Sequence, residues 1–72
     1  MKVQKMRGRL KEVEQQVAEL ESEIQQHETA LAEFINVEET VRLNDLLTAR
    51  RKELETRVAE WEELSAELET NA

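Results

Sequence analysis

The chain contains two runs of mostly apolar residues, one in each half, and each run has alternating three- and four-residue spacing. In the first half the spaced positions are Val3, Met6, Leu10, Val13, Val17, Leu20, Ile24, His27, Leu31 and Phe34. In the second half they are Thr40, Leu43, Leu47, Arg50, Leu54, Arg57, Trp61, Leu64 and Leu68. This spacing places the members of each run on one face of an α-helix, as in a coiled coil. The sequence therefore predicts two long amphipathic helices.

The two runs are out of phase with each other. Continuing the first run through the second half would bring five charged residues into the apolar interface: Glu38, Asp45, Lys52, Glu55 and Glu62. Because such residues are rarely buried, the phase change indicates a turn rather than one continuous helix. We therefore predict an all-α fold with a single domain over residues 1–72, an antiparallel two-helix coiled-coil hairpin. Helix one covers about residues 3–35, the turn about 35–37 and helix two about 37–70.

The antiparallel arrangement also predicts which residues face each other. The expected pairs are Leu31 with Leu43, His27 with Leu47, Leu20 with Leu54, Val13 with Trp61, Leu10 with Leu64, and Met6 with Leu68. Each pair joins an a position to a d position, as antiparallel coiled coils require. In the flanking positions Arg9 is expected near Glu67 and Arg51 near Glu21, whereas Glu23 near Glu53 is a like-charge conflict. A parallel dimer would instead place the basic N-terminal segment against itself.

The turn carries a helix-start signal. Asn36 precedes Val37, Glu38 and Glu39, so an N-cap residue is followed by glutamate at the third helical position. In this variant of the capping box the two side chains accept hydrogen bonds from backbone donors that lack helical partners. We expect helix two to begin directly after Asn36. Neither glycine nor proline marks the end of helix one near Phe34 and Ile35.

Composition excludes several classes of function. The chain has 72 residues, 38% of them charged, with no cysteine and no proline. A two-helix rod on the order of 50 Å long leaves no room for an enclosed pocket. The chain has no nucleophile constellation, glycine-rich phosphate loop or metal-ligand cluster, so we expect no enzymatic activity, cofactor, metal or small-molecule substrate. It has no membrane-spanning segment or signal-peptide pattern, so we expect no membrane partner. The absence of cysteine favours a cytoplasmic location.

Positive charge is clustered at two places although the net charge is −7. The clusters are an N-terminal basic segment, made of Lys2, Lys5, Arg7, Arg9 and Lys11, and a central basic segment, made of Arg50, Arg51 and Lys52. One interpretation is that these residues form ion pairs with glutamates across the hairpin. The other is that they contact nucleic-acid phosphates, which requires clustered lysine and arginine. No aromatic residues alternate with them, so base stacking is not indicated.

Four residues in the interface are unusual for a coiled coil. His27 is interpreted as a polar interface residue that helps to fix the register, with pH sensing as the alternative. Arg50 and Arg57 are expected to cover Ile24 and Val17 with their aliphatic stems and to direct their guanidinium groups to water or Glu21, with a ligand contact as the alternative. Trp61 is the largest of the four. We expect it to pack in the interface against Val13.

The whole pattern resembles a known family. Two heptad helices joined by a short turn, and the closing segment Ala59-Glu60-Trp61-Glu62-Glu63-Leu64, are similar to the C-terminal coiled-coil domain of ABC-F ATPases. The resemblance implies an antiparallel hairpin that follows an ATPase cassette in a protein acting on ribosomes, with contacts to DNA in Uup-like members. It also implies that ATP hydrolysis belongs to other domains, because this chain has none of the family's nucleotide motifs.

These patterns support two functional hypotheses. The first is a non-enzymatic interaction module that contacts the ribosome, RNA or DNA through the two basic segments. The second is a protein-assembly module, a homodimer in which Ala30, Leu46 and Val58 beside the interface join two hairpins into a four-helix bundle. A lone two-helix hairpin is marginally stable, which favours some form of association.

Overall fold

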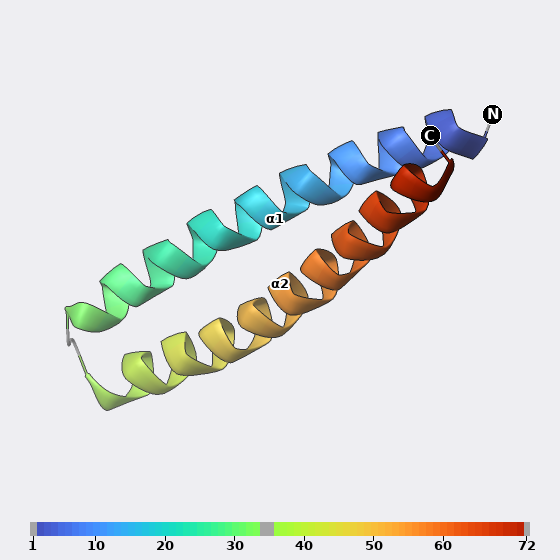
Figure 1. Cartoon of the computed structure of the whole chain (residues 1–72). Coiled ribbons are helices and arrows are strands. Elements are labelled where there is room, and N and C mark those ends of the chain that lie inside the picture. The colour runs from blue at the N-terminus through green and yellow to red at the C-terminus, as the bar shows by residue number, and fades with distance from the viewer. Residues whose placement is uncertain (1, 34–35, 72) are drawn as a thin grey trace.

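The protein folds as a helical hairpin. A computed structural model describes residues 2–33 and 36–71, and places helix α1 over Lys2–Ala32 and helix α2 over Val37–Asn71. The two helices run antiparallel along the length of the molecule, with the start of α1 and the end of α2 at the same end (Figure 1). The predicted all-α antiparallel hairpin is therefore confirmed.

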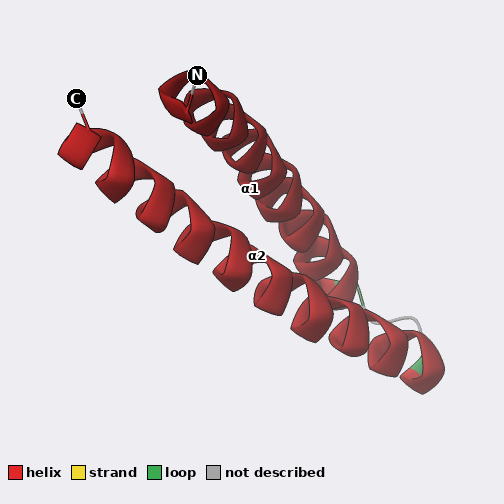
Figure 2. Ribbon diagram, turned by 90° about the vertical axis from the view of Figure 1, so that its right-hand side faces the viewer, coloured by secondary structure: helices red, strands yellow, loops and turns green. Residues whose placement is uncertain are grey.

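The hairpin is a rod with little interior. Its principal extents are 52 × 14 × 14 Å. Its accessible surface is 5632 Å², whereas a compact monomer of this mass would expose about 4,600 Å². The excess arises because each helix has only one neighbour against which to bury a face, and Figure 2 shows the two helices lying side by side. No helix in the described part of the chain is long and apolar enough to cross a membrane.

The buried side chains are a subset of the predicted interface positions. Over the described residues the buried hydrophobic side chains are Met6, Val13, Ile24, Leu43 and Leu47. Val13 is fully buried and Leu47 is 2% exposed. The remaining leucines of the two runs, such as Leu20 and Leu54, are partly exposed because only one partner helix covers them. The three- and four-residue spacing thus identified the correct face of each helix.

The start of α2 confirms the predicted N-cap. The backbone N–H of Glu39 donates a 2.8 Å hydrogen bond to Asn36 Oδ1, and the N–H of Thr40 donates to the Asn36 carbonyl at 3.1 Å. The second hydrogen bond of the expected capping box, from the backbone N–H of Asn36 to the Glu39 carboxylate, is not formed. The Glu39 carboxylate instead accepts hydrogen bonds from Arg42, one turn further along α2. Glu38 and Glu39 also lie in the first turn, where the helix dipole favours negative charge.

Helix α1 ends through a tightened last turn. The N–H of Glu33 donates to the Ala30 carbonyl at 3.1 Å, an i to i−3 bond that satisfies one of the carbonyls left free at a helix end. The described helix ends at Ala32. The expected boundary near Phe34 and Ile35, and the interface position assigned to Phe34, lie outside the described residues.

Candidate nucleic-acid interface and charged interface residues

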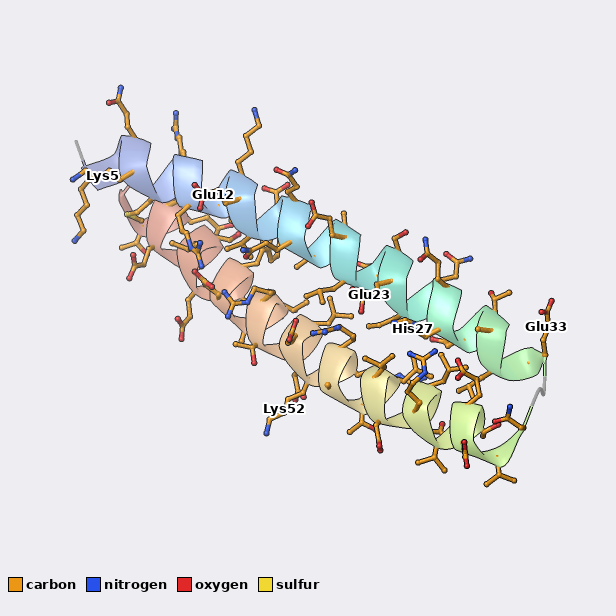
Figure 3. All side chains as sticks on the ribbon, turned by 180° about the vertical axis from the view of Figure 1, so that it is seen from behind. Lys5, Glu12, Glu23, His27, Glu33 and Lys52 are labelled. Carbon is orange, nitrogen blue, oxygen red and sulfur yellow. The ribbon has the colours of Figure 1, made fainter. Side chains whose placement is uncertain are left out.

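The N-terminal basic segment lies on the first three turns of α1, at the open end of the hairpin. Lys2, Lys5, Arg7 and Lys11 are exposed, and none of them makes an ion pair with another described residue. Arg7 and Lys11 are four residues apart and Lys2 and Lys5 three apart, so each pair shares a helix face, and at about 100° per residue the two pairs lie on opposite flanks of α1. Figure 3 shows Lys5 extending outward at this end. These four residues form the largest set of uncompensated cations in the described chain, and we call them the terminal cation cluster.

Arg9 differs from its neighbours in the same segment. Its Nε donates to Glu60 Oε2 at 2.6 Å and its Nη2 to Glu60 Oε1 at 3.0 Å, a bidentate pair between α1 and α2. Its Nη1 also donates to Glu12 at 3.2 Å. These hydrogen bonds raise the pKa of Arg9 and compensate its charge. Arg9 therefore belongs to the hairpin's internal ion pairs, and its partner on α2 is Glu60, one heptad before the Glu67 near which it was expected.

The central basic segment is largely neutralised by α1. Arg50 pairs with Glu23 and Glu53, and Arg51 Nη2 lies 3.5 Å from Glu28 Oε1. The expected partner of Arg51 was Glu21, one heptad closer to the start of α1, and that prediction is wrong. Only Lys52 has no ion-pair partner among the described residues, and Figure 3 shows it pointing away from α1. This segment does not form a second cluster of free positive charge.

Arg50 resolves the like-charge conflict predicted between Glu23 and Glu53. Its Nε donates to Glu23 Oε2 at 2.6 Å and its Nη1 to Glu53 Oε1 at 2.5 Å, so one guanidinium lies between the two carboxylates. The side chain is 30% exposed, which agrees with an aliphatic stem in the interface and a charged head at its edge. The Arg50 guanidinium was expected to reach water or Glu21. It pairs with Glu23 instead.

His27 joins the same group of charges. Its Nε2 lies 3.1 Å from Glu23 Oε2, one turn earlier on α1, and its side chain is 21% exposed. Figure 3 shows Glu23 and His27 on the side of α1 that faces α2. The hydrogen bonds from His27 first, and then from Arg50, lower the pKa of Glu23. His27 thus helps to hold Glu23 ionised beside Arg50.

Glu60 is a second carboxylate shared by several charged neighbours, and it lies nearer the open end of the hairpin than Glu23. It accepts the bidentate pair from Arg9 on α1 and a 2.7 Å hydrogen bond from Arg57 Nη1 on α2. Its side chain is 27% exposed. The head of Arg57, expected in water or at Glu21, therefore lies against Glu60. Sequence reasoning missed Glu23 and Glu60 as centres of ion pairing. The arginines at interface positions could have indicated these centres. Each guanidinium must lie at the edge of the apolar face, where a neighbouring carboxylate can pair with it.

Trp61 is less buried than predicted. The indole is 39% exposed, whereas Val13, its expected partner, is fully buried. Trp61 instead lines an open groove at the edge of the interface together with Val17 and Ala18. An interface between only two helices cannot fully enclose a side chain as large as tryptophan, so part of the ring stays exposed at the edge of the interface. The expectation that Trp61 anchors a buried core is wrong.

The opposite edge of the interface has a polar groove of about 480 Å³. Its lining includes Gln16, Leu20 and Arg57, with carboxylates from Glu19, Glu23 and Glu53. Gln16 Oε1 is buried there without a hydrogen-bond partner. The groove is open to solvent, and no cluster of three or more potential metal ligands is present in the described part of the chain.

Glu60 provides a direct test of the ion pairs. The hydrogen bond from Arg9 is the largest cause of a lowered pKa at Glu60, so ionised Glu60 favours the folded state. This contribution is fully present above the unfolded value of 4.5 and is lost as the pH falls through the lower folded pKa. Thermal unfolding followed by circular dichroism should therefore show Glu60→Gln melting below the original protein at neutral pH. The difference should close as the pH falls below about 4.5.

A matched control is Glu62→Gln, which removes the same charge from an exposed residue that makes no ion pair with another described residue. We expect a smaller change in its melting temperature. Equal behaviour of the two variants at every pH would show that the Glu60 pairs do not stabilise the hairpin.

Comparison with protein-family models, curated proteins and solved structures gave no match of any of the three kinds.

Proposed function

We propose that the chain is a non-enzymatic coiled-coil interaction module that contacts RNA or DNA through the terminal cation cluster. The observation that carries the proposal is the contrast within the basic residues. Arg9, Arg50 and Arg51 are paired with glutamates, whereas Lys2, Lys5, Arg7 and Lys11 are exposed and make no ion pair with a described residue. Uncompensated cations are the groups that displace counterions from phosphates.

The position of the cluster supports the same role. It lies in the first turns of α1, at the open end of the hairpin (Figure 1), and its side chains are exposed, so a phosphate backbone can approach without disturbing the interface. The acidic end of α2, with Glu62, Glu63 and Glu69, lies at the same end. These carboxylates repel phosphates and limit affinity, so contact should be weak and strongly dependent on salt.

The hairpin form and the Trp61-Glu62-Glu63-Leu64 ending support a role as the C-terminal domain of an ABC-F ATPase. On this proposal the contacted nucleic acid is ribosomal RNA or DNA, the location is cytoplasmic, and ATP hydrolysis belongs to other domains. The hairpin supplies reach, since 52 Å of rod separates its two ends.

The alternative of a four-helix bundle is not favoured by a specific observation. Ala30 lies one heptad after Glu23, and Leu46 lies one heptad before Glu53. Both residues are therefore on the side of the polar groove, which Glu23 and Glu53 line. Val58 lines the groove at the other edge. The three residues therefore do not form one continuous apolar stripe, as a second hairpin would require.

Fluorescence anisotropy with labelled single-stranded RNA and duplex DNA tests the proposal. On duplex DNA, phosphate contacts from one pair of cations predict a slope of about −1.8 for the logarithm of the association constant against the logarithm of salt concentration, and contacts from both pairs about −3.6. The variant Lys2→Gln, Lys5→Gln, Arg7→Gln, Lys11→Gln should lose binding and its salt slope. The control Lys52→Gln removes an isolated exposed cation. It should change the affinity and the salt slope by no more than the loss of one phosphate contact would.

Two results would contradict this function. One is the absence of binding to both nucleic acids at low salt. The other is an unchanged salt slope in the quadruple variant, which would place the contact elsewhere. Circular dichroism of each variant confirms that the helices remain, because the replaced side chains are exposed.

A further inference from the structure

An apolar groove lies on the edge of the interface away from the polar groove. It measures about 330 Å³ and is lined by Glu14, Val17, Ala18, Glu21, Val58 and Trp61. We call it the Trp61 groove. Its floor combines side chains of both helices: Val17 and Ala18 from α1, and Val58 and Trp61 from α2. None of the four residues of the terminal cation cluster lines this groove, although Lys11 lies one turn before Glu14 on α1. A ligand bound here goes beyond the proposed nucleic-acid contact and does not depend on it.

The floor of this groove exposes the largest apolar side chain of the protein. Trp61 is 39% exposed and Val58 is 36% exposed, and the two lie three residues apart on the same face of α2. Val37 and Val41 are more exposed, but they lie at the far end of the hairpin and do not line this groove. A tryptophan partly exposed in a groove, with aliphatic neighbours, is typical of the residues that contribute most to helix or protein binding.

The rim of the Trp61 groove is acidic. Glu14 and Glu21 line it from α1, and Glu55 and Glu62 lie one turn before and after Val58 on α2. None of these four glutamates makes an ion pair with another described residue. The contrast is with Glu23, Glu28 and Glu60, whose charges are compensated by arginine. The groove therefore presents an apolar floor between free carboxylates.

We propose that the Trp61 groove binds a basic amphipathic helix of another protein. Such a helix places apolar residues at i, i+3 or i+4, and i+7 against Val17, Val58 and Trp61, and its flanking lysines or arginines pair with the rim glutamates. It would lie along the groove as the third helix of a three-helix bundle.

A second copy of this chain is a poorer occupant. Two copies meeting through their Trp61 grooves would bring the free glutamates of both rims together, and each copy has a net charge of −7. Like charges placed opposite each other disfavour an interface, so charge selects a basic partner over self-association.

Trp61 is the only tryptophan, so its fluorescence reports directly on the groove. The probe is a synthetic 18-residue helix with leucines on one face and lysines elsewhere. Two control peptides are used: one with glutamate in place of every lysine, and one with the lysine peptide's composition scrambled so that no apolar face forms. We expect the lysine peptide alone to cause a saturable blue shift of the emission. A scrambled peptide that binds equally well would overturn the proposal, because charge alone would then explain binding.

A matched pair of variants locates the site. Ala18→Arg fills the groove and repels a basic helix, whereas Ala49→Arg places the same side chain at another exposed helical alanine outside the groove. We expect Ala18→Arg to weaken peptide binding at least tenfold and Ala49→Arg to leave it unchanged, with both variants fully helical by circular dichroism. Equal affinities would overturn the assignment. A blue shift that appears on concentrating the protein without peptide, together with a doubled mass in sedimentation, would instead assign the groove to a second copy.

Discussion

Replacing Leu47 by alanine is expected to unfold most of the hairpin at room temperature. Leu47 is 2% exposed, and truncating a leucine buried to this degree lowers the free energy of unfolding by about 2–5 kcal/mol. A helical unit of this size, with a single narrow apolar interface, has a total stability of only about 3–5 kcal/mol. Circular dichroism should show a large loss of helical signal, and thermal unfolding should lose its cooperative transition.

Leu46→Ala is the matched control for this experiment. The two leucines are adjacent on α2 and the chemical change is identical, but Leu46 is only partly buried at the edge of the interface. We expect a clearly smaller loss of stability. If the two variants melt alike, the face of α2 that meets α1 has been assigned incorrectly.

Replacing Val13 by asparagine is expected to have an effect of similar size through a different mechanism. Val13 is fully buried, so the variant loses its apolar contacts and buries an amide that has no provided partner. Together these changes should cost on the order of 3–5 kcal/mol. Urea unfolding should show a midpoint near zero denaturant, with little native baseline.

The same substitution at Val41, which is 54% exposed near the start of α2, controls for helix propensity. Val41→Asn should change the stability by about 0.5 kcal/mol or less. A tolerated Val13→Asn would mean that the interface opens at this layer.

The antiparallel hairpin was predictable from the sequence because its determinants are local. The spacing of Val13, Ile24 and Leu47 fixes the face that each helix buries, whatever the partner. Asn36 satisfies the backbone N–H of Glu39 within one helical turn, so the start of α2 could also be predicted from neighbouring residues.

The ion pairs required the tertiary structure. Arg9 has glutamates at positions 60 and 67, and Arg51 has glutamates at 21 and 28, each pair one heptad apart on α-helices of matching phase. The heptad pattern cannot choose between such alternatives. The hairpin selects Glu60 for Arg9 and Glu28 for Arg51, which also decides that the central basic segment is neutralised.

The sequence by itself determined the two helices, the buried face of each and the position of the turn's cap, because heptad spacing and capping act over one or two helical turns. Only the tertiary structure decided which charges remain uncompensated and where Trp61 lies. A long charged side chain can reach several possible partners, and the way the helices pack decides which of them it pairs with. An interface between two helices is too thin to enclose an indole fully, so part of the ring stays exposed and lines the groove with Val58. The terminal cation cluster and the Trp61 groove are thus both products of how the two helices meet.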